Sequence, residues 1–199
     1  MNFLAHAHLS GNNQDVLFGN FIADAVKGKG FERFDTDIQL GIKLHRKIDS
    51  YTDRHPVFKE TLDRIRNDFG KYSGIVVDIY YDHFLAKNWG QYHHLELAQF
   101  AKDVYYVLDQ NYTLLPDRTK RLLPFLITQN WLVGYANLKD LQLVFYGMDR
   151  RTGLKSGMSN AVKVLEKYYD DINNDFDKYY PQLIKYSDET LLMLRKENH

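Results

Sequence analysis

Apolar residues recur three and four positions apart along almost the whole chain, and few residues interrupt them. Only four prolines and twelve glycines divide the 199 residues, so the stretches between them are long enough for amphipathic helices. We therefore predict an all-α helical bundle that forms one domain over residues 1–199. Helices are expected at 13–27, 36–52, 56–69, 73–88, 94–111, 117–130, 138–149, 158–179 and 181–196.

The chain contains no cysteine, which excludes disulfides, thiol nucleophiles, thiolate zinc sites and iron–sulfur clusters. Any metal ion must therefore bind to His, Asp or Glu side chains, to carbonyl groups or to water. The apolar runs are shorter than the roughly 20 residues of a membrane span, and the first residues lack the pattern of a signal peptide. We expect a cytoplasmic protein with no membrane partner.

The charges balance overall but are unevenly distributed. The 26 Lys and Arg residues equal the 26 Asp and Glu residues, and such a neutral chain is not expected to bind nucleic acid. Residues 27–66, however, carry ten basic side chains against seven acidic ones. This segment could form a basic face for an anionic partner.

Two aspartates and a histidine interrupt the otherwise apolar stretch 74–86. Asp78 and Asp82 are four residues apart, so a helix places them on the same face. Two like-charged carboxylates inside a protein core cost several kcal/mol each unless a positive group compensates them. The sequence therefore predicts a cationic partner here, which is either an Arg or Lys side chain or a metal ion.

Other predicted helices also carry acidic residues or histidines among apolar ones. His45 and Asp49 are also four residues apart, a spacing at which an imidazole and a carboxylate can bind one cation. Asp24 lies in a further apolar stretch. The residues alone leave two interpretations open, a metal site or a set of ion pairs that use Arg46, Arg54 and Lys27.

Four blocks within the first 90 residues carry a recognisable pattern: Met1-Asn-Phe-Leu-Ala-His6-Ala-His8-Leu, Gly19-Asn20-x-x-Ala-Asp24-x-x-Lys27-Gly28, Gly41-x-x-Leu-His45-Arg46-x-Ile-Asp49-x-Tyr-Thr-Asp53-x-His55-Pro56 and Ser73-Gly74-Ile-Val-x-Asp78-x-x-Tyr-Asp82-His83-Phe-Leu-Ala. In content and order, the blocks resemble the bacterial acyl carrier protein phosphodiesterase family. Beyond residue 89 the likeness is limited to length and helical pattern.

The resemblance implies an all-helical relative of the HD-domain phosphohydrolases, which bind divalent metals through His and Asp and hydrolyse phosphate esters. It implies removal of 4′-phosphopantetheine from a serine of holo-acyl carrier protein, with manganese as the usual metal. Acyl carrier proteins are acidic, which would suit the basic segment 27–66. The chain departs from the HD pattern in one respect, because its only adjacent pair of these residues runs in the reverse order, as Asp82-His83.

On this basis we predict that the metal ligands come from the set Asp24, His45, Asp49, Asp78, Asp82 and His6. Imidazole and carboxylate donors without thiolate suit Mn²⁺, with Mg²⁺ or another divalent ion as the alternative. His83 or His55 is expected to protonate the departing serine oxygen. Arg46, with Lys27 as a second cation, is expected to clamp the phosphate.

Two other functions use the same residues. An HD-like phosphohydrolase acting on a nucleotide or another small phosphate ester would need the same ligands. A non-catalytic helical binding module would instead pair its buried acids with Arg46 and Arg54. The sequence does not indicate an oligomeric state.

Overall fold

The computed structural model describes residues 2–197, and it contains α-helices and short 3₁₀ turns with no strand in that range. The all-α prediction is therefore confirmed, although residues 1, 198 and 199 of the predicted domain lie outside the described part. The α-helices are α1 (Phe3–His8), α2 (Gln14–Ile22), α3 (Thr36–Thr52), α4 (Pro56–Phe69), α5 (Ser73–Lys87), α6 (Leu97–Gln110), α7 (Asp117–Thr128), α8 (Trp131–Gly134), α9 (Leu138–Arg151), α10 (Ala161–Lys167) and α11 (Tyr169–Glu197).

Local signals explain where several helices begin and end. The side chain of Asn13 accepts hydrogen bonds from the first backbone N–H groups of α2, as an N-cap residue does. Pro56 occupies the first turn of α4, where its missing N–H costs nothing. Gly70 follows α4 with a φ of +53°, a backbone conformation that favours glycine and ends a helix.

The structure differs from the predicted helices in four places. The helix expected at 13–27 ends at Ile22, because the chain tightens into a 3₁₀ turn and becomes extended at Val26. The short helices α1 and α8 were not predicted, since six and four residues are too few for a periodic signal. The predicted break at Pro181 is wrong: α11 continues through this proline, and the chain breaks instead at Tyr168.

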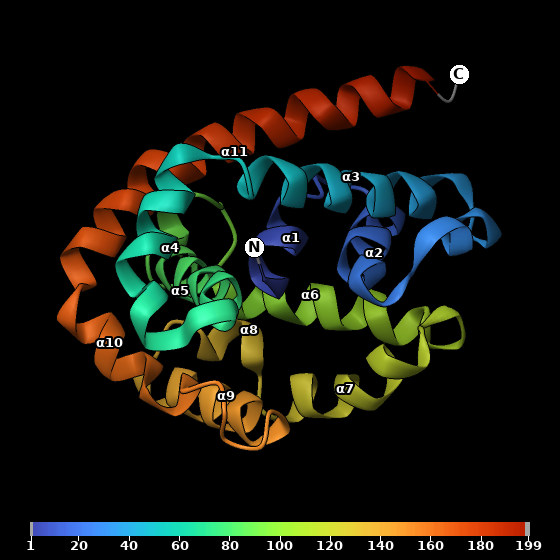
Figure 1. The fold of residues 1–199 in the computed structure, drawn as a ribbon. Helices are drawn as coiled ribbons and strands as arrows, with labels where there is room; N and C mark the ends of the chain where they lie inside the picture. The colour runs from blue at the N-terminus through green and yellow to red at the C-terminus, as the bar shows by residue number, and fades with distance from the viewer. Residues whose placement is uncertain (1, 198–199) are drawn as a thin grey trace.

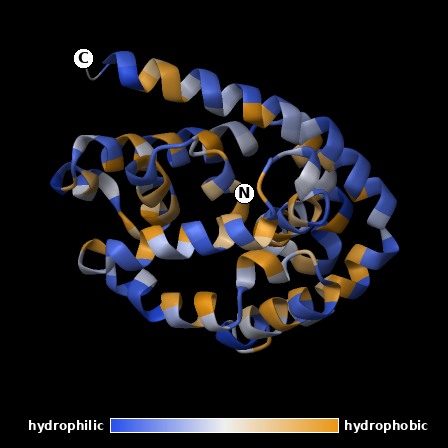
Figure 2. Cartoon of the chain, turned by 180° about the vertical axis from the view of Figure 1, so that it is seen from behind, coloured by the Kyte–Doolittle hydropathy of each residue, from blue (hydrophilic) through white to orange (hydrophobic). Residues whose placement is uncertain are grey.

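The helices surround α1, which lies in the middle of the molecule and packs on α2 and α5 (Figure 1). Helix α3 packs on α2 and on α11, the long C-terminal helix that follows the outside of the fold. Apolar residues cover much of the inward-facing side of the helices (Figure 2). Within residues 2–197, the buried apolar side chains form one cluster that extends from Leu4 to Leu194.

Helices α2 and α3 cross at backbone contact, and two glycines make this possible. A Cβ atom on Gly19 would lie 2.0 Å from the carbonyl oxygen of Ile38, and one on Gly41 would lie 2.1 Å from that of Val16. No side chain fits at either position without moving a helix. The close crossing brings Asn20, next to Gly19, against His45, which lies one turn after Gly41 on α3.

Among residues 2–197, no helix combines the length and the apolar character that crossing a membrane requires.

Candidate metal centre

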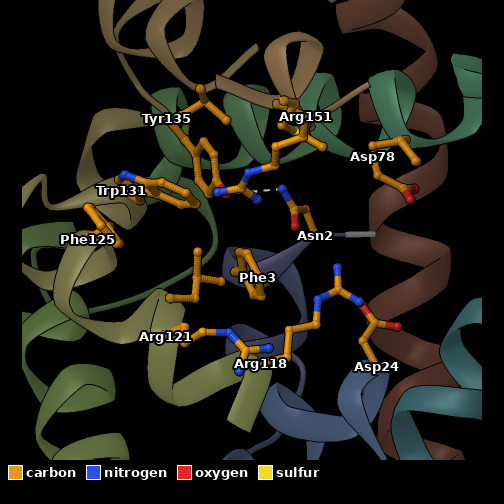
Figure 3. A pocket seen from close by; sticks show the side chains of 15 residues that line it. Asn2, Phe3, Asp24, Asp78, Arg118, Arg121, Phe125, Trp131, Tyr135 and Arg151 are labelled. Atoms are coloured by element: carbon orange, nitrogen blue, oxygen red, sulfur yellow. Dashed lines mark hydrogen bonds between the residues drawn. The ribbon is translucent and has the colours of Figure 1, made fainter. Parts of the chain in front are cut away.

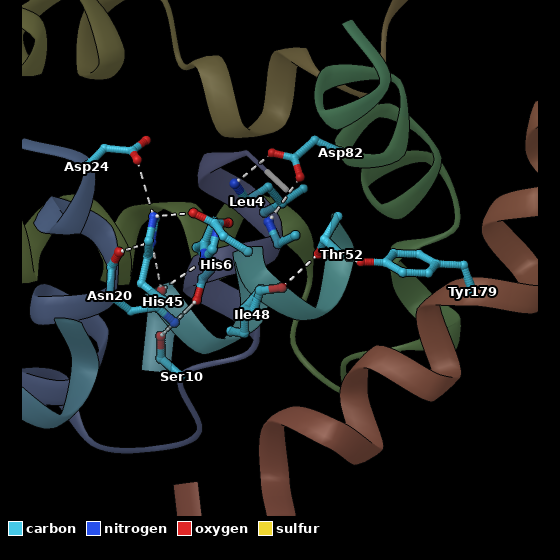
Figure 4. Close-up of polar contacts among 12 residues, drawn as sticks. Leu4, His6, Ser10, Asn20, Asp24, His45, Ile48, Thr52, Asp82 and Tyr179 are labelled. Atoms are coloured by element: carbon cyan, nitrogen blue, oxygen red, sulfur yellow. Dashed lines mark hydrogen bonds and ion pairs between the residues drawn. The ribbon is translucent and has the colours of Figure 1, made fainter. Parts of the chain in front are cut away.

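Three side chains from two helices converge beside the α2–α3 crossing. His6 comes from α1, and His45 and Asp49 come from successive turns of α3; one ligand atom of each lies within 4.8 Å of the other two (Figure 4). Asp49 bridges the two histidines, with Oδ1 3.2 Å from Nε2 of His6 and Oδ2 3.1 Å from Nε2 of His45. The two imidazole rings stack with their centroids 3.9 Å apart. We call these three residues the His–His–Asp cluster.

Asn20 holds both imidazoles from the opposite side. Its backbone oxygen accepts a hydrogen bond from Nδ1 of His45 at 2.8 Å, and its side-chain oxygen accepts one from Nδ1 of His6 at 2.9 Å. Its amide group donates to the backbone oxygen of His6 and to the hydroxyl of Ser10, which fixes the orientation of the side chain (Figure 4). Asn20 is fully buried, so this arrangement is shielded from solvent.

The hydrogen bonds to Asn20 determine which ring nitrogens carry protons. A carbonyl oxygen can only accept, so Nδ1 of both histidines carries the hydrogen and Nε2 of each neutral ring is left with a lone pair. Both lone pairs then face the carboxylate of Asp49, which also only accepts. Consistent with this, Nε2 of His6 is buried and makes no hydrogen bond among the described residues. A cation placed between these atoms would satisfy all three.

The spacing of the cluster also suits one ion. Two ligands about 2.1–2.2 Å from the same divalent ion and at right angles to each other lie about 3.0 Å apart. The 3.1 and 3.2 Å separations between the carboxylate oxygens of Asp49 and the two Nε2 atoms are close to that value. The residues present therefore fit a divalent metal ion.

The pKa values of the cluster show how it behaves without a cation. Burial and the neighbouring His45 lower the pKa of His6 to about 4. Burial also lowers the pKa of His45, but hydrogen bonds to Asp24 and Asp49 outweigh it and raise that pKa to about 9. The interactions of Asp49 with His45 and His6 overcome the effect of burial on Asp49 and lower its pKa. The metal-free cluster thus holds one proton, on His45, which a metal ion would displace.

Asp24 connects the cluster to a cavity. Its Oδ1 lies 3.3 Å from Nε2 of His45, and that hydrogen bond lowers the pKa of Asp24. Its side chain is 73% exposed, whereas those of His6 and His45 are 4% and 6% exposed. Asp24 also lines a cavity of about 480 Å³ between α5, α7, α8 and α9 (Figure 3). The cluster can therefore be reached from the side where Asp24 and the half-exposed Asp49 lie.

The two aspartates of α5 lie outside the His–His–Asp cluster. Asp82 is fully buried and accepts hydrogen bonds from the backbone N–H groups of Leu4 at 2.8 Å and Ala5 at 3.2 Å. The N-terminal end of α1 thus supplies a positive partner for Asp82. Burial nevertheless raises its pKa to about 7. Asp82 therefore anchors the helix that carries His6.

Asp78 is half-buried and lines the cavity together with Asp24. Burial raises the pKa of its carboxyl group above the ordinary value. Asp78 thus faces the space beside the cluster, although it is not one of the three residues whose ligand atoms meet.

The structure does not bring the predicted proton donors to the cluster. The ring of His83 is buried, with Nδ1 2.7 Å from the backbone oxygen of Tyr135 and Nε2 2.8 Å from the hydroxyl of Tyr169. His55 precedes α4, and its Nε2 lies 3.4 Å from the side-chain oxygen of Gln182. Both rings have structural partners, and neither lines the cavity.

Arg46 and Lys27, the residues predicted to clamp the phosphate, lie outside the cavity lining. Arg46 donates to the backbone oxygens of Val26 and Gly28 and stacks over Phe31, so it holds the loop that follows α2. Lys27 is exposed in that same loop, and neither cation lines the cavity. Among residues 2–197, the cations that do line it are Arg118, Arg121 and Arg151. These come from the half of the chain where the sequence shows no motif.

Asn20, which holds the two imidazoles, also has a role that was not predicted from the sequence. It belongs to the Gly19-Asn20 block, so the pattern itself marked the position. Its role depends on which atoms α2 presents to α1 and α3, and residue spacing does not reveal that.

Comparisons with known proteins extend the resemblance beyond the first 90 residues. Residues 1–183 match the family described as "Acyl carrier protein phosphodiesterase". The chain is 32% identical over 194 residues to the acyl carrier protein phosphodiesterase of Photorhabdus laumondii, covering 93% of this chain and 94% of that one. It is 33% identical over 189 residues to the protein of the same name from Escherichia coli O6:H1, covering 93% and 96%. No solved structure matches the chain significantly.

Proposed function

The chain belongs to the acyl carrier protein phosphodiesterase family, and we propose that its His–His–Asp cluster binds the divalent ion with which it hydrolyses its substrate. The resemblance drawn from the sequence is confirmed, and so is the predicted class of enzyme, a hydrolase of a phosphodiester bond. The reaction adds water across the bond between phosphorus and the serine oxygen of holo-acyl carrier protein. Its products are 4′-phosphopantetheine and the apo-protein.

One observation carries the metal proposal. Two imidazole Nε2 atoms face the same carboxylate within 3.2 Å, and because Nδ1 of each ring donates to Asn20, both can offer a lone pair to a metal ion that displaces the proton of His45. His6, His45 and Asp49 would supply three donors, and Asp24 would be the fourth on the cavity side. A mixed set of nitrogen and oxygen donors without thiolate favours Mn²⁺ among the common divalent ions, with Mg²⁺ as the alternative.

A divalent ion bound there would supply positive charge against the phosphoryl oxygens and make a nearby water molecule more acidic. The side chains contribute position. Asn20 holds the two imidazoles in one tautomer, and Asp82 fixes the first turn of α1 beneath His6. Because His6 and His45 are buried, the phosphodiester must approach from the side of Asp24 and Asp49.

The remaining features of the function stay predictions. The docking of an acidic carrier protein on the basic segment 27–66 is one of them, and the cytoplasmic location is another. The kinship with HD-domain phosphohydrolases is a third.

The intact mass of holo-acyl carrier protein tests the proposal. After incubation with the wild-type chain and Mn²⁺, the carrier protein should lose the mass of phosphopantetheine, and a chelator should prevent that loss. The Asp49→Ala variant should leave the mass unchanged under both conditions. A loss of mass in the presence of chelator would refute the metal, and an unchanged mass with Mn²⁺ bound would redirect the search to small phosphate esters.

A further inference from the structure

The cavity beside the cluster combines two unlike linings. Three arginines contribute to it, Arg118 and Arg121 from α7 and Arg151 from α9. Most of the other lining side chains are apolar or aromatic; they are Phe3, Ile75, Ile79, Leu122, Phe125, Trp131, Tyr135, Val144 and Met148. Asn2, Asp24 and Asp78 complete the lining. A site built this way suits a ligand that is anionic at one point and uncharged along the rest.

The three arginines have no partner within the described residues. Arg118, Arg121 and Arg151 are exposed and make neither a hydrogen bond nor an ion pair there. Arg118 and Arg121 are three residues apart on α7, so they lie on the same face of that helix. Three guanidinium groups gathered around one cavity create a positive potential that favours an anion, and arginine binds phosphate oxygens through two parallel hydrogen bonds.

Arg118 places this positive charge next to the metal centre. Its guanidinium group points toward Asp24, and both residues line the cavity (Figure 3). Asp24 in turn lies 3.3 Å from Nε2 of His45. An anionic group held by Arg118 and Arg121 would therefore lie at the end of the cavity that opens toward the cluster.

The apolar wall is unusually accessible. Phe125 is 54% exposed and Ile75 is 43% exposed, although both are large apolar side chains. Trp131 and Val144 are half-buried in the same lining. Apolar surface gathered inside a concavity, beside unpaired cations, is typical of a binding site and not of solvated surface.

We propose that this cavity binds the 4′-phosphopantetheine arm of the substrate, with Arg118 and Arg121 on its phosphate and the apolar wall along its uncharged chain. The inference rests on the proposed function, because that function supplies a ligand with this order of groups. The arm begins with a phosphate and continues as a flexible chain without charge. The volume of about 480 Å³ falls within the range of roughly 300–1,000 Å³ of small-molecule sites.

Calorimetric titration of the full chain with free 4′-phosphopantetheine tests the cavity without the carrier protein. The titration is run with Mn²⁺ and repeated with pantetheine, which lacks the phosphate. Arg121→Gln removes one of the proposed phosphate contacts at an exposed position, so it should not disturb packing. Val144→Phe places a larger side chain on the apolar wall and so narrows the cavity. Arg150→Gln and Leu143→Phe are matched controls that make the same kinds of change outside the cavity. Both residues are exposed on α9, next to Arg151 and Val144, and neither lines the cavity.

We expect Arg121→Gln to weaken 4′-phosphopantetheine binding about tenfold and to leave pantetheine binding unchanged. Val144→Phe should weaken the binding of both ligands about tenfold or more, because it fills space that the chain of the arm would occupy. The two control variants should stay within about twofold of the wild type. The proposal is overturned if the wild type does not bind 4′-phosphopantetheine, or if Arg121→Gln and Val144→Phe bind it as the controls do.

The carrier-protein mass assay on the same preparations separates this proposal from the proposed function. Loss of phosphopantetheine by the carrier protein, at equal rates for the wild type, Arg121→Gln and Val144→Phe, would keep the function and overturn the arm site. Ligand binding that depends on Arg121 and Val144, without any loss of mass, would keep the cavity and overturn the hydrolysis.

Discussion

Replacing Asn20 by alanine should weaken metal binding more than it weakens the fold. The side chain makes four buried hydrogen bonds, to Nδ1 of His6, Nδ1 of His45, the backbone oxygen of His6 and the hydroxyl of Ser10. Most of these groups keep another partner in the variant. Nδ1 of His45 still donates to the backbone oxygen of residue 20, and Ser10 still donates to the backbone oxygen of His6.

Nδ1 of His6, by contrast, loses the one acceptor that it has among residues 2–197. A buried donor without a partner costs about 1–3 kcal/mol, so we expect the free energy of unfolding to fall by about 2–3 kcal/mol in metal-free buffer. The imidazole can then shift its proton to Nε2 and donate to Asp49, which lies 3.2 Å away. That tautomer has no lone pair on Nε2, the atom that faces the cluster, so this nitrogen cannot bind a metal ion. Loss of such an outer-shell partner typically costs 10–100-fold in metal affinity, and we expect a loss of about that size.

The matched control is Asn13→Ala in the same helix. Asn13 accepts hydrogen bonds from the backbone N–H groups of Asp15 and Val16 at the start of α2. Loss of this cap should cost about 1 kcal/mol of stability and leave the cluster intact. Mn²⁺ affinity is measured by calorimetry and unfolding by urea titration with chelator. If Asn20→Ala binds Mn²⁺ within about twofold of Asn13→Ala, Asn20 does not set the tautomer and the reasoning is refuted.

Three further predictions follow from the fold and the cluster. Gly41→Ala should lose about 2–4 kcal/mol of stability, because its Cβ would lie 2.1 Å from a backbone oxygen. The control is Gly147→Ala in α9, whose Cβ would have no atom within 4 Å and which should not destabilise the protein. Urea unfolding compares the two variants. Burial raises the pKa of Asp82 to about 7, so the native state binds more protons than the unfolded chain between about pH 4 and pH 7. Stability should therefore fall as the pH rises through that window. The free energy of unfolding of the wild type should decrease by up to about 4 kcal/mol, and that of Asp82→Asn should not show this decrease. Chelator should lower the melting temperature of the wild type measured in Mn²⁺ and leave that of Asp49→Ala unchanged. Bound Mn²⁺ is expected to stabilise the wild type by about 2.7 kcal/mol when the free ion is at about 100 times its dissociation constant.

The sequence predicted the long helices well because their periodic signal is strong. Helices α3, α4 and α5 begin within a residue of their expected starts. Helix α1 escaped prediction although it carries His6, because its six residues are held by tertiary contacts such as those from Asp82 and not by their own periodicity. Pro181 misled the prediction, since a proline inside α11 does not end that helix.

For the metal centre, spacing was informative only within one helix. His45 and Asp49 follow from their four-residue separation on α3, and the quoted pattern marked His6. The buried acid at Asp82 was correctly expected to need a positive partner, but that partner is a helix terminus, which the sequence of α5 does not reveal. The position of Arg118 beside Asp24 depends on how the fold brings α7 to the cavity, and no local pattern encodes it.

Counting bound Mn²⁺ by electron paramagnetic resonance, in the wild type and in His45→Ala, tests the metal centre most directly. His45 contacts both Asp49 and Asp24, so its loss removes one donor and the link between the other two, while Asn20 remains in place. We predict one tightly bound ion per wild-type chain and none in the variant at the same concentration. Equal binding of Mn²⁺ by the two proteins would contradict the assignment of the cluster.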